Sequence, residues 1–224
     1  MTAPLRVAGL TPLTTIDFPG RLAAVVFLQG CPWHCGYCHN PGLIAADAAP
    51  AMPWQQVRAF LQRRRGLLDG VVFSGGEPTL QAGLGDAVRE VRDLGFEVGL
   101  HTAGMYPDRL AGLLPALDWI GLDVKAPQPE HDTLTGVSGS AAKARASLAH
   151  VLRSGIAYEC RTTWHAGLFA IDRLLALARE LSAAGVTHWA VQGCRAGNRP
   201  PPTSAPAELN GIAELFTDLR LRWS

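Results

Sequence analysis

The sequence predicts an α/β protein, an open partial (β/α)6 TIM-type barrel with parallel strands inside and helices outside. Short apolar runs alternate with helical patterns along the chain, which is typical of βα units that feed one parallel sheet. The 224 residues are 48% hydrophobic and 17% charged, enough to bury one substantial core. Six units are too few for the closed eight-stranded barrel, but six parallel strands can curl into an open version of it. We therefore expect a single domain over residues 1–224.

The expected strands are short runs rich in apolar and β-branched residues. They cover Ala23–Leu28, Gly70–Ser74, Phe96–Thr102, Trp119–Val124, Ala157–Thr163 and His188–Gln192.

The expected helices follow these strands, and several have readable ends. They cover Trp54–Arg65, Leu80–Leu94, Tyr106–Leu114, Ala141–Ser154, Ala170–Ala184 and Ala207–Leu219. Gly95, Gly155 and Gly185 follow three of them, at the place where a left-handed residue commonly ends a helix. Thr79 is placed to cap the second helix. Residues 198–206 are rich in proline and predict a loop near the C-terminus.

Composition narrows the class of partner and the compartment. The formal charge is +1, and the longest basic run is Arg63–Arg65, so we expect neither a nucleic acid nor a membrane as a partner. No apolar segment approaches the roughly 20 residues that span a bilayer, and we expect a cytoplasmic protein. Three of the five cysteines fall within eight residues, which indicates a metal site rather than a disulfide framework.

The strongest chemical signal is the segment Gly30–Pro41, directly after the first expected strand. Its cysteines, with the spacing C-x3-C-x2-C, are Cys31, Cys35 and Cys38. A four-iron cubane normally takes four thiolates, so three thiolates leave one iron open to bind another molecule. A zinc site completed by His34 or His39 is the alternative, because Cys3His is a common structural zinc set. The spacing alone leaves both interpretations open.

A second motif, Ser74–Pro78, ends the next strand. Its paired glycines, Gly75 and Gly76, let the backbone approach a ligand closely. Glu77 offers a carboxylate that can accept a hydrogen bond from a cationic amine. Alternatively, its charge stabilises the amino end of the next helix.

The cysteine loop followed by this Gly-Gly-Glu-Pro turn resembles the radical S-adenosylmethionine superfamily. Within it, the runs Ile16–Arg21 and Val26–Pro41 are similar to the glycyl-radical-enzyme activases, and most similar to the activating proteins of anaerobic ribonucleoside-triphosphate reductase. Pyruvate formate-lyase activase is a more distant resemblance. Leu122–Lys125 and Leu134–Ser138 also match in order and spacing, so the resemblance covers most of the chain.

The resemblance implies an oxidoreductase with one [4Fe–4S] cluster, whose open iron binds the amino and carboxylate groups of S-adenosylmethionine. One electron then cleaves the sulfonium, and the resulting 5′-deoxyadenosyl radical takes a hydrogen atom from a backbone glycine of a partner enzyme. The partner that it implies is anaerobic ribonucleotide reductase, and the reductant is a flavodoxin or ferredoxin.

Residue roles also follow from the resemblance. Contacts with the cofactor are implied for Tyr37, Cys38, His39, Gly75, Gly76, Glu77, Thr102, Asp123, Lys125 and Arg161. Asp17 is implied to face the glycine loop of the substrate, and no side chain is implied to act as an acid or base.

The charged residues are consistent with these roles. Asp123 and Lys125 are two apart on a strand and therefore point to the same face. Charges that face the centre of a curled sheet are costly unless they are paired or bind a ligand. A mutual salt bridge is the alternative explanation. Arg161 shares its face of the fifth strand with Glu159 and Thr163.

Some positions depart from the activase pattern. The third strand ends in His101-Thr102-Ala103-Gly104, where the activases usually have an Asp-Thr-Asn-Gly-like sequence, so we expect no cation site there and treat His101 as a hydrogen-bonded core histidine. Cys160 is expected to pack outward against helices. Cys194 and Arg195 receive no role.

Six motif segments lie at or just beyond the carboxyl end of an expected strand, the edge where barrel enzymes place their sites. They are the cysteine loop, Ser74–Pro78, His101–Gly104, Asp123–Lys125, Arg161–Thr163 and Gln192–Arg195. Two other functions remain open. One is a radical enzyme that acts on a small molecule, similar to the 7-carboxy-7-deazaguanine synthases, against which the Ile16–Arg21 run argues. The other is an iron–sulfur or zinc protein without turnover.

Overall fold

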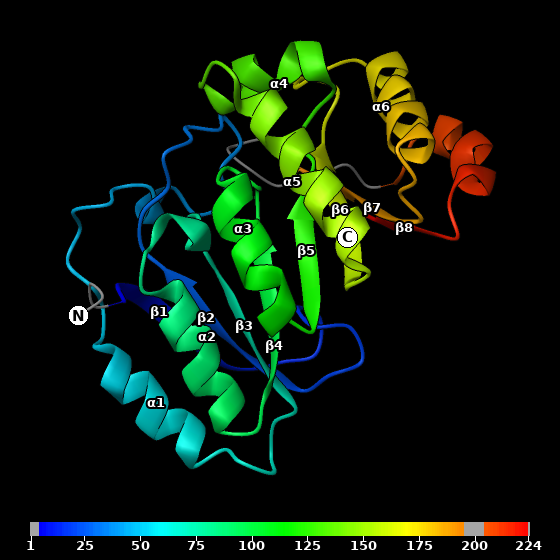
Figure 1. The fold of residues 1–224 in the computed structure, drawn as a ribbon. Helices are drawn as coiled ribbons and strands as arrows, with labels where there is room; N and C mark the ends of the chain where they lie inside the picture. Colours follow the sequence, from blue (N-terminus) through cyan, green and yellow to red (C-terminus); the bar gives the residue numbers. More distant parts are fainter. Residues whose placement is uncertain (1–4, 195–203, 224) are drawn as a thin grey trace.

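The computed structural model describes residues 5–194 and 204–223, and these form one eight-stranded sheet in sequential order (Figure 1). The strands are β1 (Val7–Thr14), β2 (Ala23–Leu28), β3 (Gly70–Gly75), β4 (Glu97–Thr102), β5 (Trp119–Asp123), β6 (Ala157–Trp164), β7 (His188–Gly193) and β8 (Asp218–Arg222). Strands β2 to β8 are parallel to one another, and β1 pairs antiparallel with β2.

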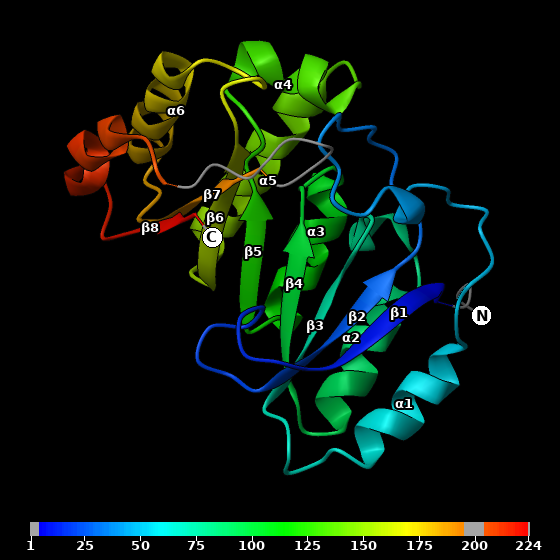
Figure 2. The ribbon, with the colours of Figure 1, turned by 180° about the vertical axis from the view of Figure 1, so that it is seen from behind.

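Helices cover the outer face of this sheet. They are α1 (Trp54–Gln62), α2 (Leu84–Asp93), α3 (Pro107–Leu113), α4 (Gln128–Thr135), α5 (Ser140–Ser154) and α6 (Ile171–Ala183), with 3-10 turns η1 (Pro41–Leu43), η2 (Pro78–Leu80), η3 (Leu114–Ala116) and η4 (Ala207–Leu215). Figure 2, the view from behind, shows the other face of β1 to β5 without covering helices. The architecture is the open partial barrel that the sequence predicts.

The six expected strands correspond to β2 to β7, but the sheet has two more. The expected count of six parallel strands is therefore wrong, because β8 also joins the parallel set. The helix expected over Ala207–Leu219 is a 3-10 helix, η4, and it ends at Leu215, because the alternating sequence from Asp218 to Arg222 forms β8. β1 contains Gly9 and Pro12 and buries only its two ends, so it lacks a strong strand pattern.

Two local expectations also need correction. Thr79 does not cap α2, which begins at Leu84 after Gly83; it belongs to η2 instead. α4 was not expected, because its sequence has little apolar periodicity. In contrast, Gly155 ends α5 with φ of 70°, as predicted, and Gly95 and Gly185 also have positive φ after their helices. Most of the expected loop 198–206 lies outside the described residues.

The core has two layers because neighbouring strand residues point to opposite faces. Val26, Phe73 and Leu122 belong to the larger layer between sheet and helices. The inner layer is small and lies near the amino ends of the strands, where Phe18 stacks on Trp119 with ring centroids 5.8 Å apart. This inner layer fills the amino end of the curled sheet and leaves its carboxyl end for polar groups. No helix in the described ranges has the length and apolarity to cross a membrane.

Candidate active site

A cavity of about 350 Å³ opens at the carboxyl end of the sheet, and it brings together all six segments that the sequence singles out. The predicted site residues that line it are Asp17, Cys31, Cys35, Tyr37, Cys38, His39, Gly75, Gly76, Thr102, Asp123, Lys125 and Arg161. Residues far apart in the chain thus meet in one place, as the positions at strand ends predict.

Glu77 is the predicted site residue that the cavity does not include. Its side chain is 0% exposed. Its carboxylate accepts hydrogen bonds from the hydroxyl and backbone N–H of Thr79, from the Thr102 hydroxyl at 2.6 Å and from the Ala103 N–H at 2.9 Å. Burial raises the pKa of Glu77, and these donors oppose that effect. The carboxylate therefore joins the end of β3 to the end of β4.

The cysteine loop is held by its own backbone and by the loop that follows it. The N–H of Gly30 donates to the carbonyl of Leu43 at 2.8 Å, and that of Cys31 donates to Ile44 at 3.0 Å. The buried amide of Gln29 donates to two further carbonyls of the second loop, Gly42 and Ala45. These bonds anchor the start of the cysteine loop, at Cys31, against the second loop.

The three thiols fit a cluster by their chemistry. All three are free and partly buried, and burial raises the pKa of Cys31 to about 11, so iron binding must displace a thiol proton. Soft thiolates are the usual ligands of iron–sulfur clusters. A cubane takes each thiolate on a different iron, so three thiolates would leave its fourth iron open.

The remaining cysteines lie away from the cavity wall. Cys160 is wholly buried in the outer layer, as predicted, and burial raises its pKa to about 12. Cys194 is also buried, and its backbone N–H donates to the Trp164 carbonyl at 2.9 Å. Arg195 lies outside the described residues.

The two glycines of the β3 turn form a cradle that only glycine fits. A Cβ on Gly75, whose φ is +120°, would lie 2.3 Å from the backbone nitrogen of Leu28, and one on Gly76 would lie 2.3 Å from the carbonyl oxygen of Gly30. The N–H of Gly76 donates to Leu28 and that of Glu77 donates to Gly30. The turn therefore lies directly against the start of the cysteine loop, with its backbone on the cavity.

Three charged side chains face the cavity from the end of β5, the residues just after it, and β6. Asp123 pairs with Lys125 at 3.2 Å and with Arg161 at 3.4 Å, so the salt bridge considered as the alternative explanation is present and includes a second cation. Burial raises the pKa of Asp123, but Lys125 and Arg161 together hold it below the usual value. The side chain of Asp123 is 38% exposed, against 14% for each cation. Two cations around one carboxylate leave a net positive charge for an anionic ligand group.

His101 is hydrogen-bonded, as predicted, but it lies on the cavity rather than in the core. Its Nε2 is 2.9 Å from the carbonyl oxygen of Asp17 and 3.3 Å from a guanidinium nitrogen of Arg161. One ring nitrogen cannot donate to the first and accept from the second, and the shorter contact indicates that it donates to Asp17. Burial, followed by the charge of Arg161, lowers the pKa of His101 to about 3, so the ring is neutral.

Several residues of the cavity wall were given no role from the sequence. Trp33 and Met105 are apolar, and Gln192 donates to the hydroxyl of Thr163 at 2.8 Å. Trp33 stands inside the C-x3-C spacing, so its position was a signal, but nothing in the spacing distinguishes it from a solvent-exposed residue.

Comparisons with known proteins agree on the family. The family model described as the radical SAM superfamily matches residues 25–169. A protein of Methanocaldococcus jannaschii, provisionally named a glycyl-radical enzyme activating enzyme, is 28% identical over 181 residues, which are 70% of this chain and 68% of that protein. The pyruvate formate-lyase-activating enzyme of Clostridium pasteurianum is 31% identical over 54% of this chain.

The match covers only 52% of the Clostridium protein, so the chain spans about half the length of that relative. Among solved structures, a radical SAM methyltransferase from Sphaerobacter thermophilus superposes with a TM-score of 0.68. It is 16% identical and the match covers 95% of this chain and 68% of that one, so it supports the fold alone.

Proposed function

Because this chain belongs to the radical S-adenosylmethionine superfamily, we propose that it is an activase that cleaves S-adenosylmethionine reductively at one [4Fe–4S] cluster and generates a glycyl radical on a partner enzyme. The observation that carries the proposal is the cavity in which three thiols, a glycine cradle and a charged trio meet.

Each wall of the cavity suits one part of the cofactors. Cys31, Cys35 and Cys38 would hold the cluster. The backbone of Gly75 and Gly76 would bind the methionyl amine, and the buried Glu77 would orient that backbone. The positive pair, Lys125 and Arg161, would bind the carboxylate and ribose together with Asp123. Tyr37, His39 and Thr102 complete the cofactor wall.

When bound, the cluster and S-adenosylmethionine supply the radical chemistry, in which methionine and a 5′-deoxyadenosyl radical arise and the radical takes a hydrogen atom from glycine. The chain's own residues bind and orient these cofactors, and they exclude water from the cavity. Lys125 lies 5.7 Å from the centre of the buried Tyr37 ring, which orders the wall beside the cysteine loop. No side chain in the cavity is needed as an acid or base.

The proposed partner is a glycyl radical enzyme, and the run Ile16–Arg21 favours anaerobic ribonucleoside-triphosphate reductase. Asp17, which reaches the cavity from the loop between β1 and β2, would face the glycine loop of that partner. Its carboxylate accepts a hydrogen bond from the Thr14 hydroxyl at 2.5 Å, so it is held in place before any partner binds. A flavodoxin or ferredoxin is the proposed reductant.

The experiment that tests the proposal begins with anaerobic reconstitution of the cluster. The wild type, reduced with dithionite in the presence of S-adenosylmethionine, should release 5′-deoxyadenosine. Cys35→Ala should bind less iron and release none, while Cys160→Ala, the matched control from the outer layer, should retain both. If the loaded and reduced wild type releases no 5′-deoxyadenosine, the enzyme proposal fails and a metal protein without turnover takes its place.

A second step identifies the partner. Anaerobic ribonucleotide reductase and pyruvate formate-lyase are each incubated with the reduced protein, and the glycyl radical is sought by electron paramagnetic resonance. A signal on the reductase alone supports the proposed partner, and a signal on the lyase alone replaces it. Release of 5′-deoxyadenosine without a radical on either enzyme would favour a small-molecule substrate.

A further inference from the structure

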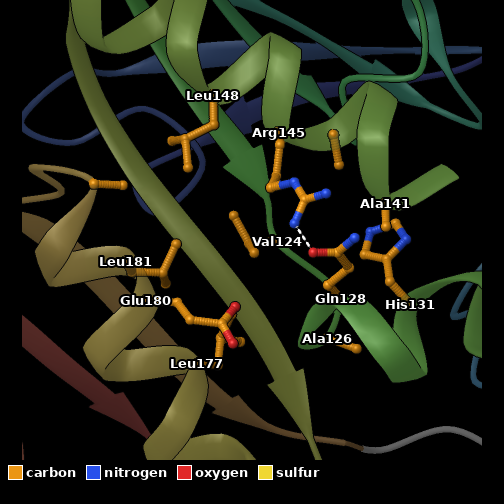
Figure 3. A pocket seen from close by; sticks show the side chains of 12 residues that line it. Val124, Ala126, Gln128, His131, Ala141, Arg145, Leu148, Leu177, Glu180 and Leu181 are labelled. Atoms are coloured by element: carbon orange, nitrogen blue, oxygen red, sulfur yellow. Dashed lines mark hydrogen bonds between the residues drawn. The ribbon is translucent and has the colours of Figure 1, made fainter. Parts of the chain in front are cut away.

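His131, in α4, is a buried histidine that does not line the cavity, and no role follows for it from the motifs. It is 2% exposed. Figure 3 shows its ring beside Gln128 and Ala141, at one end of a small, mostly apolar pocket of about 80 Å³ between α4, α5 and α6. Burying an imidazole costs free energy unless its polar atoms have partners, so the contacts of His131 indicate its role.

The hydrogen bonds around His131 select one form of its ring. Nδ1 lies 2.8 Å from the hydroxyl of Ser140, which donates its single proton to the carboxylate of Asp132 at 2.8 Å. The serine oxygen therefore accepts from His131, so Nδ1 carries the proton and Nε2 keeps its lone pair. Burial, followed by the charge of Lys125, lowers the pKa of His131 to about 4, in agreement with a neutral ring. Nε2 is buried without a hydrogen-bond partner.

This ring packs against the cysteine loop. The rings of His131 and Trp33 meet edge to face, with centroids 5.4 Å apart and an angle of 84° between the planes. Trp33 is itself buried, and it belongs to a small apolar cluster against which Cys31 and Cys35 pack. Next to it, the backbone N–H of His34 donates to the carbonyl of Thr135, the last residue of α4, at 2.9 Å. Two of the three residues between Cys31 and Cys35 are thus held by α4.

The short helix α4 is in turn tied to the start of α5. Asp132 accepts hydrogen bonds from the backbone of Gly139 at 2.6 Å and of Ala141 at 2.9 Å, in addition to that from Ser140. The hydroxyl of Thr135 donates to the carbonyl of His131 at 2.9 Å and lies 2.7 Å from the Ser140 hydroxyl. A continuous set of contacts therefore runs from the 15-residue helix α5 to the cysteine loop.

We propose that His131 is a positioning residue, which supports Trp33 and so holds the C-x3-C segment in the conformation that turns its thiols to the cavity before a cluster binds. The proposal rests on the proposed function only in taking Cys31, Cys35 and Cys38 as the cluster ligands. The proposal adds α4 and α5, the helices that hold the cysteine loop, to the elements that shape the site.

The first test uses the full chain without iron. Iodoacetamide alkylation of each cysteine is followed by mass spectrometry in the wild type, His131→Ala and His131→Phe. If the ring supports the loop, Cys31 and Cys35 should be alkylated about fivefold faster in His131→Ala than in the wild type, because the loop would lose local order. His131→Phe keeps a ring against Trp33 and should restore most of the protection. The control His150→Ala, on the far part of α5, should leave all rates unchanged.

Cys160 serves as an internal monitor, because it is buried in the outer layer in every variant that folds. If Cys160 also becomes reactive in His131→Ala, the variant Ser140→Ala is used in its place. Ser140→Ala keeps the His131 ring and removes the hydrogen-bond acceptor that orients the ring. Rates for Cys31 and Cys35 that stay within the wild-type range in the folded variant would overturn the proposal.

The second test uses the reconstituted protein. His131→Ala should change the electron paramagnetic resonance spectrum of the reduced cluster, or lower the iron bound per chain, and His131→Phe should restore it. A wild-type spectrum with full iron in His131→Ala would also overturn the proposal. Because alkylation needs neither iron nor S-adenosylmethionine, its result stands whether or not the wild type releases 5′-deoxyadenosine.

Discussion

The buried carboxylate of Glu77 accepts a hydrogen bond from the hydroxyl of Thr102 at 2.6 Å. Glu77 follows β3 and Thr102 is the last residue of β4. This bond therefore joins the carboxyl ends of adjacent strands beside the glycine cradle. The same hydroxyl accepts from the backbone of Gly104 at 3.0 Å, which extends the network to the next turn. The Gly-Gly-Glu-Pro motif thus divides into a backbone part, exposed to the cavity, and a side-chain part that orients it.

Replacing Glu77 tests that division. Glu77→Gln puts a donor where the carboxylate accepts from four groups, so at least one buried donor loses its partner. We expect a loss of about 1–3 kcal/mol in the free energy of unfolding, measured by urea denaturation, because that is the cost of leaving a buried polar group unpaired. The same change on the surface, Glu214→Gln, should have little effect. An unchanged midpoint in Glu77→Gln would mean that the network is not stabilising.

The glycine cradle makes a steric prediction. Gly76→Ala would place a methyl group 2.3 Å from the carbonyl of Gly30, so the β3 turn or the cysteine loop must move. We expect reduced iron binding after reconstitution, measured as iron per chain, together with lower thermal stability. Gly112→Ala is the matched control, because no atom lies within 4 Å of its Cβ and the residue is in α3. Gly112→Ala should raise the free energy of unfolding slightly, by about 0.5–1 kcal/mol. Full iron loading of Gly76→Ala would contradict the steric argument.

The charged trio makes a prediction about ligand affinity. Asp123→Asn removes the counter-charge that holds Lys125 and Arg161 in place, along with a proposed ribose contact. We expect the Kd for S-adenosylmethionine, measured calorimetrically with the cluster-loaded protein, to rise about tenfold or more, which corresponds to about 1.4 kcal/mol. Asp172→Asn, in the first turn of α6, should leave the Kd unchanged. Equal affinities in the two variants would remove the trio from the binding site.

Asp132 makes a prediction about pH. Hydrogen bonds from the backbone of Ala141 and Gly139 and from the Ser140 hydroxyl lower its pKa from 3.8 to about 2. A lowered folded-state pKa means that this residue stabilises the protein above pH 4, and that the contribution disappears as the pH falls towards 2. Asp132→Asn should therefore melt at a lower temperature than the wild type at pH 6, and the gap should narrow below pH 4.

The control for this experiment is Asp47→Asn, at an exposed loop position. It should show no gap at any of these pH values. A gap for Asp132→Asn that persists unchanged from pH 6 to pH 3 would show that the carboxylate charge is not what stabilises the start of α5.

Most of the barrel could be predicted because its strands carry a local signal. Val25 and Val72 point into the inner layer, and Val26 and Phe73 point into the outer one. Because these strands are buried on both faces, their sequences are nearly continuous in apolar residues. β8 could not be predicted in the same way, because Leu219 and Leu221 alternate with charges over only five residues. Its identity as a strand depends on the pairing with β7, which lies some 25 residues earlier in the chain.

The sequence by itself determined where the reactive groups lie along the chain: the spacing of Cys31, Cys35 and Cys38, the paired glycines and the two-residue separation of Asp123 and Lys125 are local properties of the chain. Only the tertiary structure decided which groups meet. It directed Glu77 away from the cavity into a network with Thr102, brought His101 to the carbonyl of Asp17, and placed His131 behind Trp33. The physical reason is that hydrogen bonds and packing between distant segments depend on the closure of the sheet, and no local pattern encodes the partner of a buried polar group.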